Sequence, residues 1–201
     1  MVNKGIKVTK LIKKQNKRKQ IAKSTCNLFI EKGFVNISIS EIAKVANIGK
    51  GTVYEYFTNK EDIIFELMSC LQEDYDPKLK SNLAKSENTK QKVVYLFDLF
   101  VSEDETVKIQ KKIYKEFIAV YLNNASDEIK KYQKTMKDKY TDILMTIFQE
   151  AISNGELVED AIELVPSIFA TVEGYFIIHD DTQIIIEYFD VLFKILCKNK
   201  D

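Results

Sequence analysis

The sequence is poor in histidine, the side chain that most often acts as a general acid or base in catalysis. It has no tryptophan and a single histidine, His179, which stands beside two aspartates. A lone histidine of this kind is more often a surface or helix-cap residue than a catalytic base, and no residues have the spacing of a metal site. Gly49-Lys50-Gly51 lacks the longer glycine pattern of a phosphate-binding loop, and no strand precedes it. We therefore expect no catalytic residue, metal or cofactor, and no enzyme.

Cysteine and long apolar runs are also scarce. Cys26, Cys70 and Cys197 are isolated, with no Cys-x-x-C pair, which agrees with a reducing compartment. The N-terminus lacks an apolar signal core, and no apolar run approaches the roughly 18–20 residues that cross a bilayer. We expect a cytoplasmic protein without membrane contact, whose thiols fill the core. A redox-sensing thiol is the alternative, since it needs an exposed, electropositive setting.

Glycine and proline, which interrupt helices, number only six and two among 201 residues. Strand signals are nearly absent, and 45% hydrophobic residues suffice for a sizeable core. The predicted fold class is all-α, with about nine helices and a kink at Asp76-Pro77. After residue 60 we expect helices at about 60–84, 89–102, 105–122, 126–153, 160–179 and 182–197.

The net charge of zero conceals two oppositely charged parts. Residues 1–60 carry 13 Lys or Arg against 3 Asp or Glu, whereas residues 61–201 carry 17 against 27. A basic end on an acidic remainder is typical of a protein that binds nucleic acid at one end. The first fourteen residues form a basic arm that we expect to be flexible, and its lysines are open to the simpler interpretation of solvated charge.

Residues 38–49 have the pattern of a short helix followed by a tight turn. Ser38 and Glu41 have the spacing of a capping box, so a helix is expected to start at Ser38. Asn47 and Gly49 tolerate the left-handed backbone that ends a helix and turns the chain. A second helix is expected from about Lys50 to Tyr56, which completes a helix-turn-helix.

In a helix-turn-helix, the N-terminus of the second helix enters the major groove of DNA. Lys50 and Thr52 can contact base edges, and Gly51 permits close approach of the backbone. Arg18 is the single arginine, so readout is expected to rely on lysine, threonine, tyrosine and DNA shape, unless Arg18 or the flexible arm reaches the DNA. Taken singly, each tyrosine could be core and each lysine solvated. The candidate DNA-binding residues are Ser38, Lys50, Gly51, Thr52, Tyr54, Tyr56 and Lys60, of which the last three are expected to hold phosphates.

Residues from about 17 to 65 resemble the DNA-binding head of the TetR family of transcriptional regulators. Two segments carry the resemblance: a first helix, IAKSTCNLFIEKGF from Ile21 to Phe34, and the stretch IGKGTVYEYFTNKEDI. Gly49 departs from the family's usual Ser or Thr cap, and Glu55 places an acid on the recognition helix. The resemblance implies a DNA-binding domain at 15–59, after the arm at 1–14, and a helical effector-binding and dimerisation domain at 60–201.

The last two predicted helices are rich in large apolar residues on more than one face. Such stripes commonly mark self-association through a four-helix bundle, and the resemblance implies the same homodimer; the alternative is a core within one subunit. A dimer would read both half-sites of a palindromic operator, about 34–36 Å apart. The candidate interface comprises Ile168, Phe169, Val172, Phe176, Ile185, Tyr188, Phe189, Leu192, Phe193 and Leu196.

The acidic remainder is expected to bind a small apolar or amphipathic effector of unknown identity. We expect this effector to release the protein, which would act as a repressor, from double-stranded DNA by tilting the long helix after Lys60. The alternative function is an all-helical protein–protein interaction module with a basic end. Candidate ligand-lining residues are Phe97, Phe100, Glu116, Phe117, Tyr121, Tyr140, Phe148 and Tyr175, with Glu173 as a further polar anchor.

Overall fold

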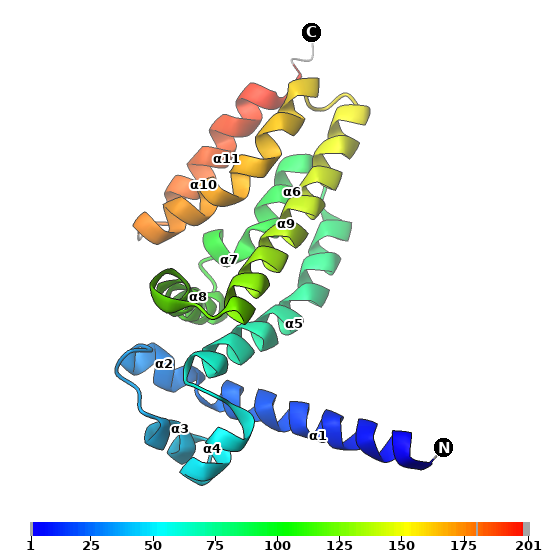
Figure 1. Ribbon diagram of the computed structural model, residues 1–201. Coiled ribbons are helices and arrows are strands. Elements are labelled where there is room, and N and C mark those ends of the chain that lie inside the picture. Colours follow the sequence, from blue (N-terminus) through cyan, green and yellow to red (C-terminus); the bar gives the residue numbers. More distant parts are fainter. Residues whose placement is uncertain (1, 180, 199–201) are drawn as a thin grey trace. The chain divides into compact units, whose positions relative to one another are not determined.

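The computed structural model describes residues 2–179 and 181–198, with side chains for residues 8–123, 125–179 and 181–198 (Figure 1). Within these ranges the chain is helical and has no strand beyond an isolated bridge between Leu157 and Cys197. The predicted all-α fold is therefore confirmed. The helices are α1 Val2–Ser24, α2 Cys26–Lys32, α3 Ile39–Val45, α4 Lys50–Tyr56, α5 Glu61–Lys85, α6 Thr89–Leu96, α7 Asp98–Val101, α8 Glu105–Asn124, α9 Asp127–Ser153, the 3-10 helix η1 Glu159–Leu164, α10 Val165–Ile178 and α11 Gln183–Leu196.

The chain divides into two compact units. The head unit comprises Met1–Asp74 and Lys112–Ser126, and the body unit comprises Tyr75–Lys111 and Asp127–Asp201. Helices α5 and α8 each begin in one unit and end in the other. The division thus differs from the expected boundary at residues 59 and 60, because the first half of α5 and the second half of α8 pack with the head.

Helix α1 is longer than expected. The described part of the arm is helical and continuous with α1, whereas a flexible segment was expected. Lysine and glutamine are good helix formers, and carboxylates of α5 bind cations of the second half of α1. The predicted first helix at Ile21–Phe34 is instead shared between α1 and α2. They are separated at the buried Thr25, whose hydroxyl donates to the Ala22 carbonyl at 2.7 Å.

The predicted body helices are present with small changes in their ends. Helix α5 continues through Pro77 rather than stopping there. The expected helix at 89–102 is divided into α6 and α7 at Phe97, and η1 replaces the first turns of the expected helix at 160–179.

The candidate dimer residues do not form an outer face. All of them except the half-buried Tyr188 are buried within the body unit, where α10 packs on α9 and η1, and α11 packs on α6, α7 and α10. In the structure these residues, apart from Tyr188, belong to the core of a single subunit. The apolar residues that α10 and α11 leave exposed are Ile177, Ile178, Val191 and Ile195.

Helix α10 with η1 is unusually apolar. Glu159–Ile178 is, by length and composition alone, apolar enough to cross a membrane, with a mean hydropathy of 1.5, and one third of it is buried in the structure. The stretch does not stand out as one apolar run in the sequence, since charged residues at its start interrupt it. A core helix of a soluble protein meets the same criterion.

Candidate nucleic-acid interface

Helix α3 begins with the predicted capping box. Ser38 is the N-cap, with φ −96° and ψ 154°, and its hydroxyl accepts the Glu41 N–H at 3.3 Å. The Glu41 carboxylate accepts the Ser38 N–H at 2.9 Å and binds the Lys32 ammonium. These contacts, first of all the one with Lys32, lower the pKa of Glu41 to about 2. The start of α3 is thus fixed by its own sequence.

The turn between α3 and α4 depends on Asn47. Its φ of 52° is the one positive value at a non-glycine residue in the described chain, and asparagine tolerates this region better than most residues. Gly49 has an extended backbone and is the N-cap of α4 without a side-chain bond. Asn47, rather than Gly49, therefore supplies the left-handed residue of the turn.

Helix α4 has one buried face and one open face. Val53 and the following Phe57 are buried, so they anchor the helix in the head. Lys50, Gly51 and Tyr54 are exposed, and Tyr54 retains 54% of its accessible surface. Thr52 and Tyr56 are half-buried, and the cap Ser38 is exposed. The N-terminal residues of α4 are therefore free to meet a partner.

Lys60 lies apart from this open face. Its ammonium donates to the carbonyls of Phe34 at 2.7 Å, Ile37 at 3.0 Å and Val35 at 3.2 Å, and it sits 4.4 Å from the centroid of the Phe34 ring. These acceptors occupy the ammonium, so Lys60 fixes the segment between α2 and α3. A phosphate contact by Lys60, as expected from the sequence, would have to displace them.

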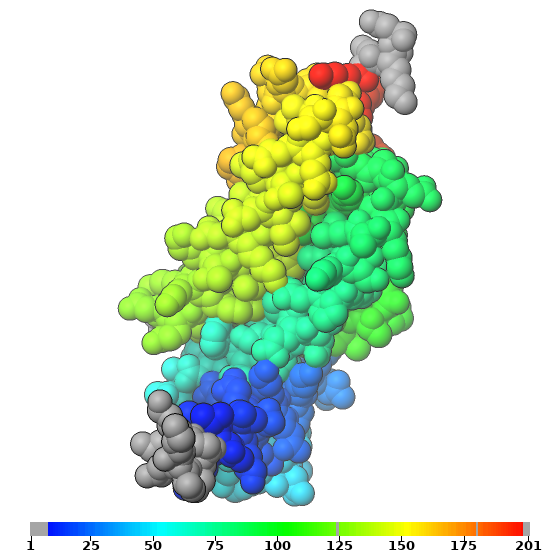
Figure 2. Space-filling view, turned by 90° about the vertical axis from the view of Figure 1, so that its right-hand side faces the viewer, coloured from blue at the N-terminus to red at the C-terminus, as the bar shows by residue number. Residues whose placement is uncertain are grey.

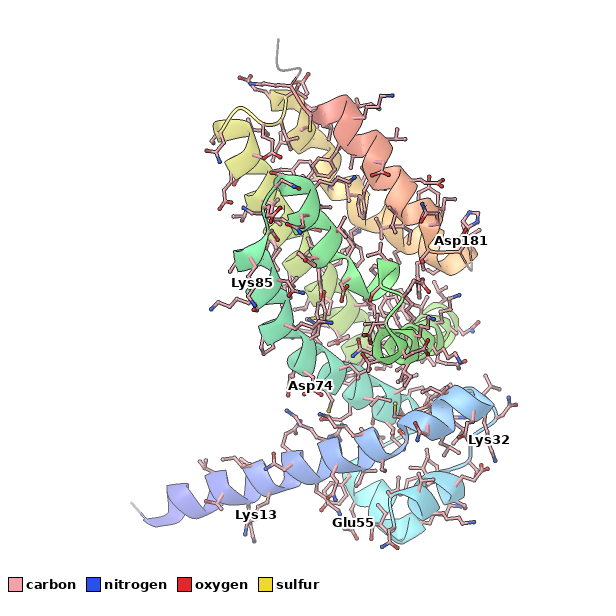
Figure 3. All side chains as sticks on the ribbon, turned by 180° about the vertical axis from the view of Figure 1, so that it is seen from behind. Lys13, Lys32, Glu55, Asp74, Lys85 and Asp181 are labelled. Atoms are coloured by element: carbon pink, nitrogen blue, oxygen red, sulfur yellow. The ribbon has the colours of Figure 1, made fainter. Side chains whose placement is uncertain are left out.

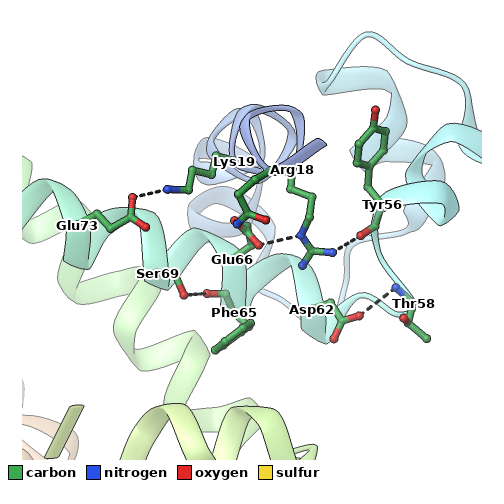
Figure 4. Close-up of polar contacts among 10 residues, drawn as sticks. Arg18, Lys19, Tyr56, Thr58, Asp62, Phe65, Glu66, Ser69 and Glu73 are labelled. Carbon is green, nitrogen blue, oxygen red and sulfur yellow. Dashed lines mark hydrogen bonds and ion pairs between the residues drawn. The ribbon is translucent and has the colours of Figure 1, made fainter. Parts of the chain in front are cut away.

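Arg18 is also used inside the head (Figure 4). Its Nε donates to Glu66 Oε2 at 2.9 Å, and its Nη1 donates to the carbonyl of Tyr56, the last residue of α4. The guanidinium stands 4.4 Å from the centroid of Phe57, and Gln15 donates to the other oxygen of Glu66 at 3.0 Å. Arg18 therefore joins α1, the end of α4 and α5, a role that the sequence signalled only by the scarcity of arginine.

Three of the candidate effector residues belong to the head. Glu116 Oε2 accepts the backbone N–H of Phe34 at 2.6 Å, Phe117 is fully buried with its ring centroid 6.3 Å from that of Tyr114, and Tyr121 is half-buried. All three lie in the part of α8 that packs with the head. They therefore belong to a different unit from the other candidate residues, because α8 changes unit after Lys111.

The other candidate effector residues lie in the body but not in one group. Phe97, Phe100 and Tyr140 gather around Phe169, with ring centroids 6.0–6.4 Å from its ring. Phe148 packs against Phe193, and Tyr175 against Tyr188. Phe97, Phe100, Tyr140, Phe169, Phe176 and Phe189 form what we call the aromatic cluster.

The body also holds a polar pair. Gln133, which is buried, donates to Glu173 Oε1 at 3.1 Å. Glu173 lies on α10 between the buried Val172 and Phe176 in the sequence. The body thus contains a largely buried aromatic cluster and a carboxylate bound by a buried glutamine.

The cysteines differ in exposure. Cys70 is buried, Cys26 is half-buried and Cys197 is exposed, so only Cys70 fits the expectation of core filling fully. Burial raises the pKa of each thiol above its ordinary value, which lowers its thiolate fraction at neutral pH.

A capped first helix, a left-handed turn and a second helix with an open N-terminal face define a helix-turn-helix DNA-binding protein. Residues 21–67 match the sequence profile of the bacterial regulatory proteins of the tetR family. The chain therefore carries the DNA-binding domain of this family, as the sequence predicted, and is related to its transcriptional regulators. Its relatives are regulators rather than enzymes.

Two curated relatives illustrate the similarity. The HTH-type transcriptional regulator QacR of Staphylococcus aureus is 26% identical over 129 residues, 64% of this chain and 67% of its own length. The fatty acid metabolism regulator protein of Bacillus subtilis is 25% identical over 150 residues, 73% of each chain.

Solved structures share the fold. A TetR-family regulator from Cytophaga hutchinsonii superposes with a TM-score of 0.76 at 19% identity, over 94% of this chain and 98% of its own. The regulator FadR from Bacillus subtilis, solved in complex with stearoyl-CoA, gives a TM-score of 0.64 at 21% identity, over 87% and 96%.

Proposed function

We propose that this regulator is a cytoplasmic repressor that binds a palindromic operator as a homodimer and leaves it when a small amphipathic molecule binds the body. The open N-terminal face of α4 carries the proposal. Lys50, Thr52 and Tyr54 would contact base edges from this face, and Gly51 would let the backbone approach the duplex. Ser38 and Tyr56, at the ends of the helix-turn-helix, would hold phosphates and fix the register.

Pairing of two subunits through α10 and α11 is supported by the apolar residues that these helices leave exposed. Ile178 and Ile195 retain 77% and 69% of their accessible surface, and Val191 retains 57%. Covering them would remove apolar surface from water, which favours association. Among the interface residues predicted from the sequence, the half-buried Tyr188 could contact a partner subunit.

The character of the effector is supported by the body unit. The aromatic cluster offers apolar surface and the Gln133–Glu173 pair offers polar anchors, which together suit a ligand with an apolar part and a donor group. One relative is named for fatty acid metabolism, and one structural neighbour was solved with stearoyl-CoA. Both observations favour a ligand with a long apolar chain.

Selection of bound fragments from the source genome tests the DNA-binding part. A two-fold symmetric sequence should emerge, with half-sites about one helical turn apart. An asymmetric single site would contradict the homodimer, and recovery of no fragment at low salt would contradict operator binding and favour the interaction module.

The coupling between effector and operator needs its own measurement. The affinity for a long-chain acyl thioester should fall in the presence of operator by the factor by which the thioester weakens DNA binding, on the order of 5- to 150-fold. Equal affinities with and without operator would contradict the release mechanism.

A further inference from the structure

The cations of α1 fall into two groups. In its second half, Arg18 pairs with Glu66, Lys19 with Glu73 and Lys23 with Asp74, all on the first half of α5. Figure 4 shows the contacts of Arg18 and Lys19. Arg18, Lys19 and Lys23 are therefore neutralised by the head itself and hold α1 in place, whereas Lys17 donates to the amide oxygen of Gln20.

The preceding turns of α1 have no such counter-charge. Lys10, Lys13 and Lys14 are exposed and have no acidic partner among the residues whose side chains the structure describes. No aspartate or glutamate occurs before Glu31 in the whole sequence. The surplus of positive charge on this part of α1 is thus left for an external anion.

These lysines line a groove that reaches the recognition helix. Lys10, Leu11, Lys13 and Lys14 form one wall, and Glu55 and Tyr56 of α4 form the other, around an open volume of about 470 Å³. The Lys13 side chain leaves α1 toward the side on which α3 and α4 lie (Figure 3), and the segment drawn in dark blue lies at the surface (Figure 2). Three lysines and one glutamate therefore line a groove that extends to the end of α4.

Such an arrangement is unfavourable in the free protein. Lysines three and four positions apart on a helix repel each other by about 0.2–0.5 kcal/mol per pair. Lys10 stands at these spacings from Lys13 and Lys14 on α1. A row of phosphates would remove this penalty.

We propose that Lys10, Lys13 and Lys14 hold the DNA backbone just outside the bases that α4 reads, so that α1 lengthens the contact on each half-site. The proposal rests on the proposed function, since it assumes that α4 sits on a duplex. At about 1.5 Å per residue, Lys14 and Lys10 lie about 6 and 12 Å along α1 from Arg18, which is fixed to the end of α4. This reach corresponds to about two to four base pairs.

An anionic membrane is the rival partner, because Val8, Leu11 and Ile12 are exposed beside the lysines. DNA is favoured by the second wall of the groove, which is the recognition helix itself. A partner that contacts the lysines in this groove also contacts Tyr56. Tyr56 belongs to α4, the proposed recognition helix.

The test compares the native chain with the triple variant Lys10→Gln, Lys13→Gln, Lys14→Gln. A matched control is Lys80→Gln, Lys131→Gln, Lys137→Gln, which removes three exposed lysines from the body unit. Affinity for an operator duplex selected from random DNA is measured from about 50 to 200 mM salt. Each phosphate contact contributes about 0.9 to the slope of log affinity against log salt.

For the triple variant, the slope should be less steep by about 2–3, so its affinity falls about 15- to 60-fold less over this range than that of the native chain. Its preference among bases should stay unchanged, and shortening the flanks of the duplex should weaken the native chain but not the variant. The control should behave like the native chain in every assay. Lys13→Glu alone should reduce the slope by at least about 1, which keeps the test decisive if the triple variant folds poorly.

Equal slopes for native, triple and single variants would overturn the proposal while leaving operator binding intact. The proposal also fails if the substitutions abolish binding to phosphatidylglycerol vesicles but leave the DNA slope unchanged. If the native chain itself binds no duplex, the proposed function fails first, and the two failures are thus distinguishable.

Discussion

Glu116 accepts a hydrogen bond of 2.6 Å from the backbone N–H of Phe34, which lies 82 residues earlier in the chain. Next to this bond, Gly33 has a φ of 71°, and a methyl group added to it would stand 3.4 Å from Glu116 Oε1. The carboxylate on α8 and the left-handed glycine together fix the exit of α2.

We expect Glu116→Ala to lower the free energy of unfolding by about 1–3 kcal/mol, because it leaves the Phe34 N–H without its acceptor. Gly33→Ala should cost about 1 kcal/mol or more, since it forces a side chain into the left-handed region. Urea unfolding measures both. Gly174→Ala is the control, because its methyl would meet nothing within 4 Å in a helix, so it should be neutral or stabilising. A stability of Gly33→Ala equal to that of Gly174→Ala would contradict the role of Gly33.

Substitution of Lys60 should mainly affect stability, whereas substitution of Lys50 should mainly affect base recognition. Lys60→Ala removes the donor to three carbonyls and should destabilise the protein by about 1–3 kcal/mol. Lys50→Ala, at an exposed position, should change stability by less than about 0.5 kcal/mol but relax base preference at one position per half-site. Unfolding curves and selection on an operator library check the pair. The opposite pattern, a stable Lys60 variant with weak DNA binding, would return Lys60 to the phosphate contacts.

The substitution Arg18→Lys keeps the positive charge. A lysine ammonium lacks the planar guanidinium that donates to Glu66 and to the Tyr56 carbonyl together. We expect a loss of about 1–2 kcal/mol in unfolding free energy and weaker binding to all duplexes alike, because the end of α4 is less firmly held. Lys23→Gln, which breaks an ion pair between two exposed side chains, is the comparison and should cost less than about 1 kcal/mol. Equal effects of the two substitutions would show that Arg18 contributes only a surface charge.

The substitution Gly51→Ala should affect folding stability and DNA affinity differently. The methyl group would meet nothing within 4 Å, so the variant should fold at least as well and gain up to about 1 kcal/mol. On DNA the methyl lies where the backbone is proposed to approach the bases, so affinity should fall. Calorimetry and a titration with operator duplex measure both effects. An unchanged affinity would place the backbone of α4 further from the duplex.

Acid should weaken the capping of α3. Because the folded protein lowers the pKa of Glu41 to about 2 from an ordinary value of 4.5, its contribution to stability is present above pH 4.5 and is lost as the pH falls toward 2. In Glu41→Gln this part of the pH dependence should disappear. Urea unfolding at several pH values between 5 and 3 measures the difference between the two proteins. Identical pH profiles would show that Glu41 keeps the same pKa when the chain unfolds.

The sequence predicted the helix-turn-helix closely because its determinants are local. The capping box of Ser38 and Glu41, the left-handed Asn47 and the buried Val53 act within a few residues of one another, so their pattern is visible in the chain itself. Contacts between distant residues left no such pattern. The bonds from Arg18 to Glu66 and from the Phe34 N–H to Glu116 join residues that are 48 and 82 positions apart in the chain.

The assignment of apolar faces in the body was less successful for a physical reason. Apolar residues cover more than one face of α10, and its periodicity alone does not tell which stripe meets α9 and which meets solvent. The larger side chains, among them Phe169, Phe176 and Phe189, are buried in the subunit. The aliphatic residues Ile178, Val191 and Ile195 remain outside.

The passage of α5 and α8 from one unit to the other has a practical consequence. The backbone crosses the division three times, after Asp74, Lys111 and Ser126, and two of these crossings lie inside a helix rather than in a linker. Cutting the gene near residue 60 would therefore strip the head of Glu66 and Glu116, the acceptors that hold its first helices. Proteases should find no hinge at which to release a folded fragment, and truncation should yield an insoluble or molten product.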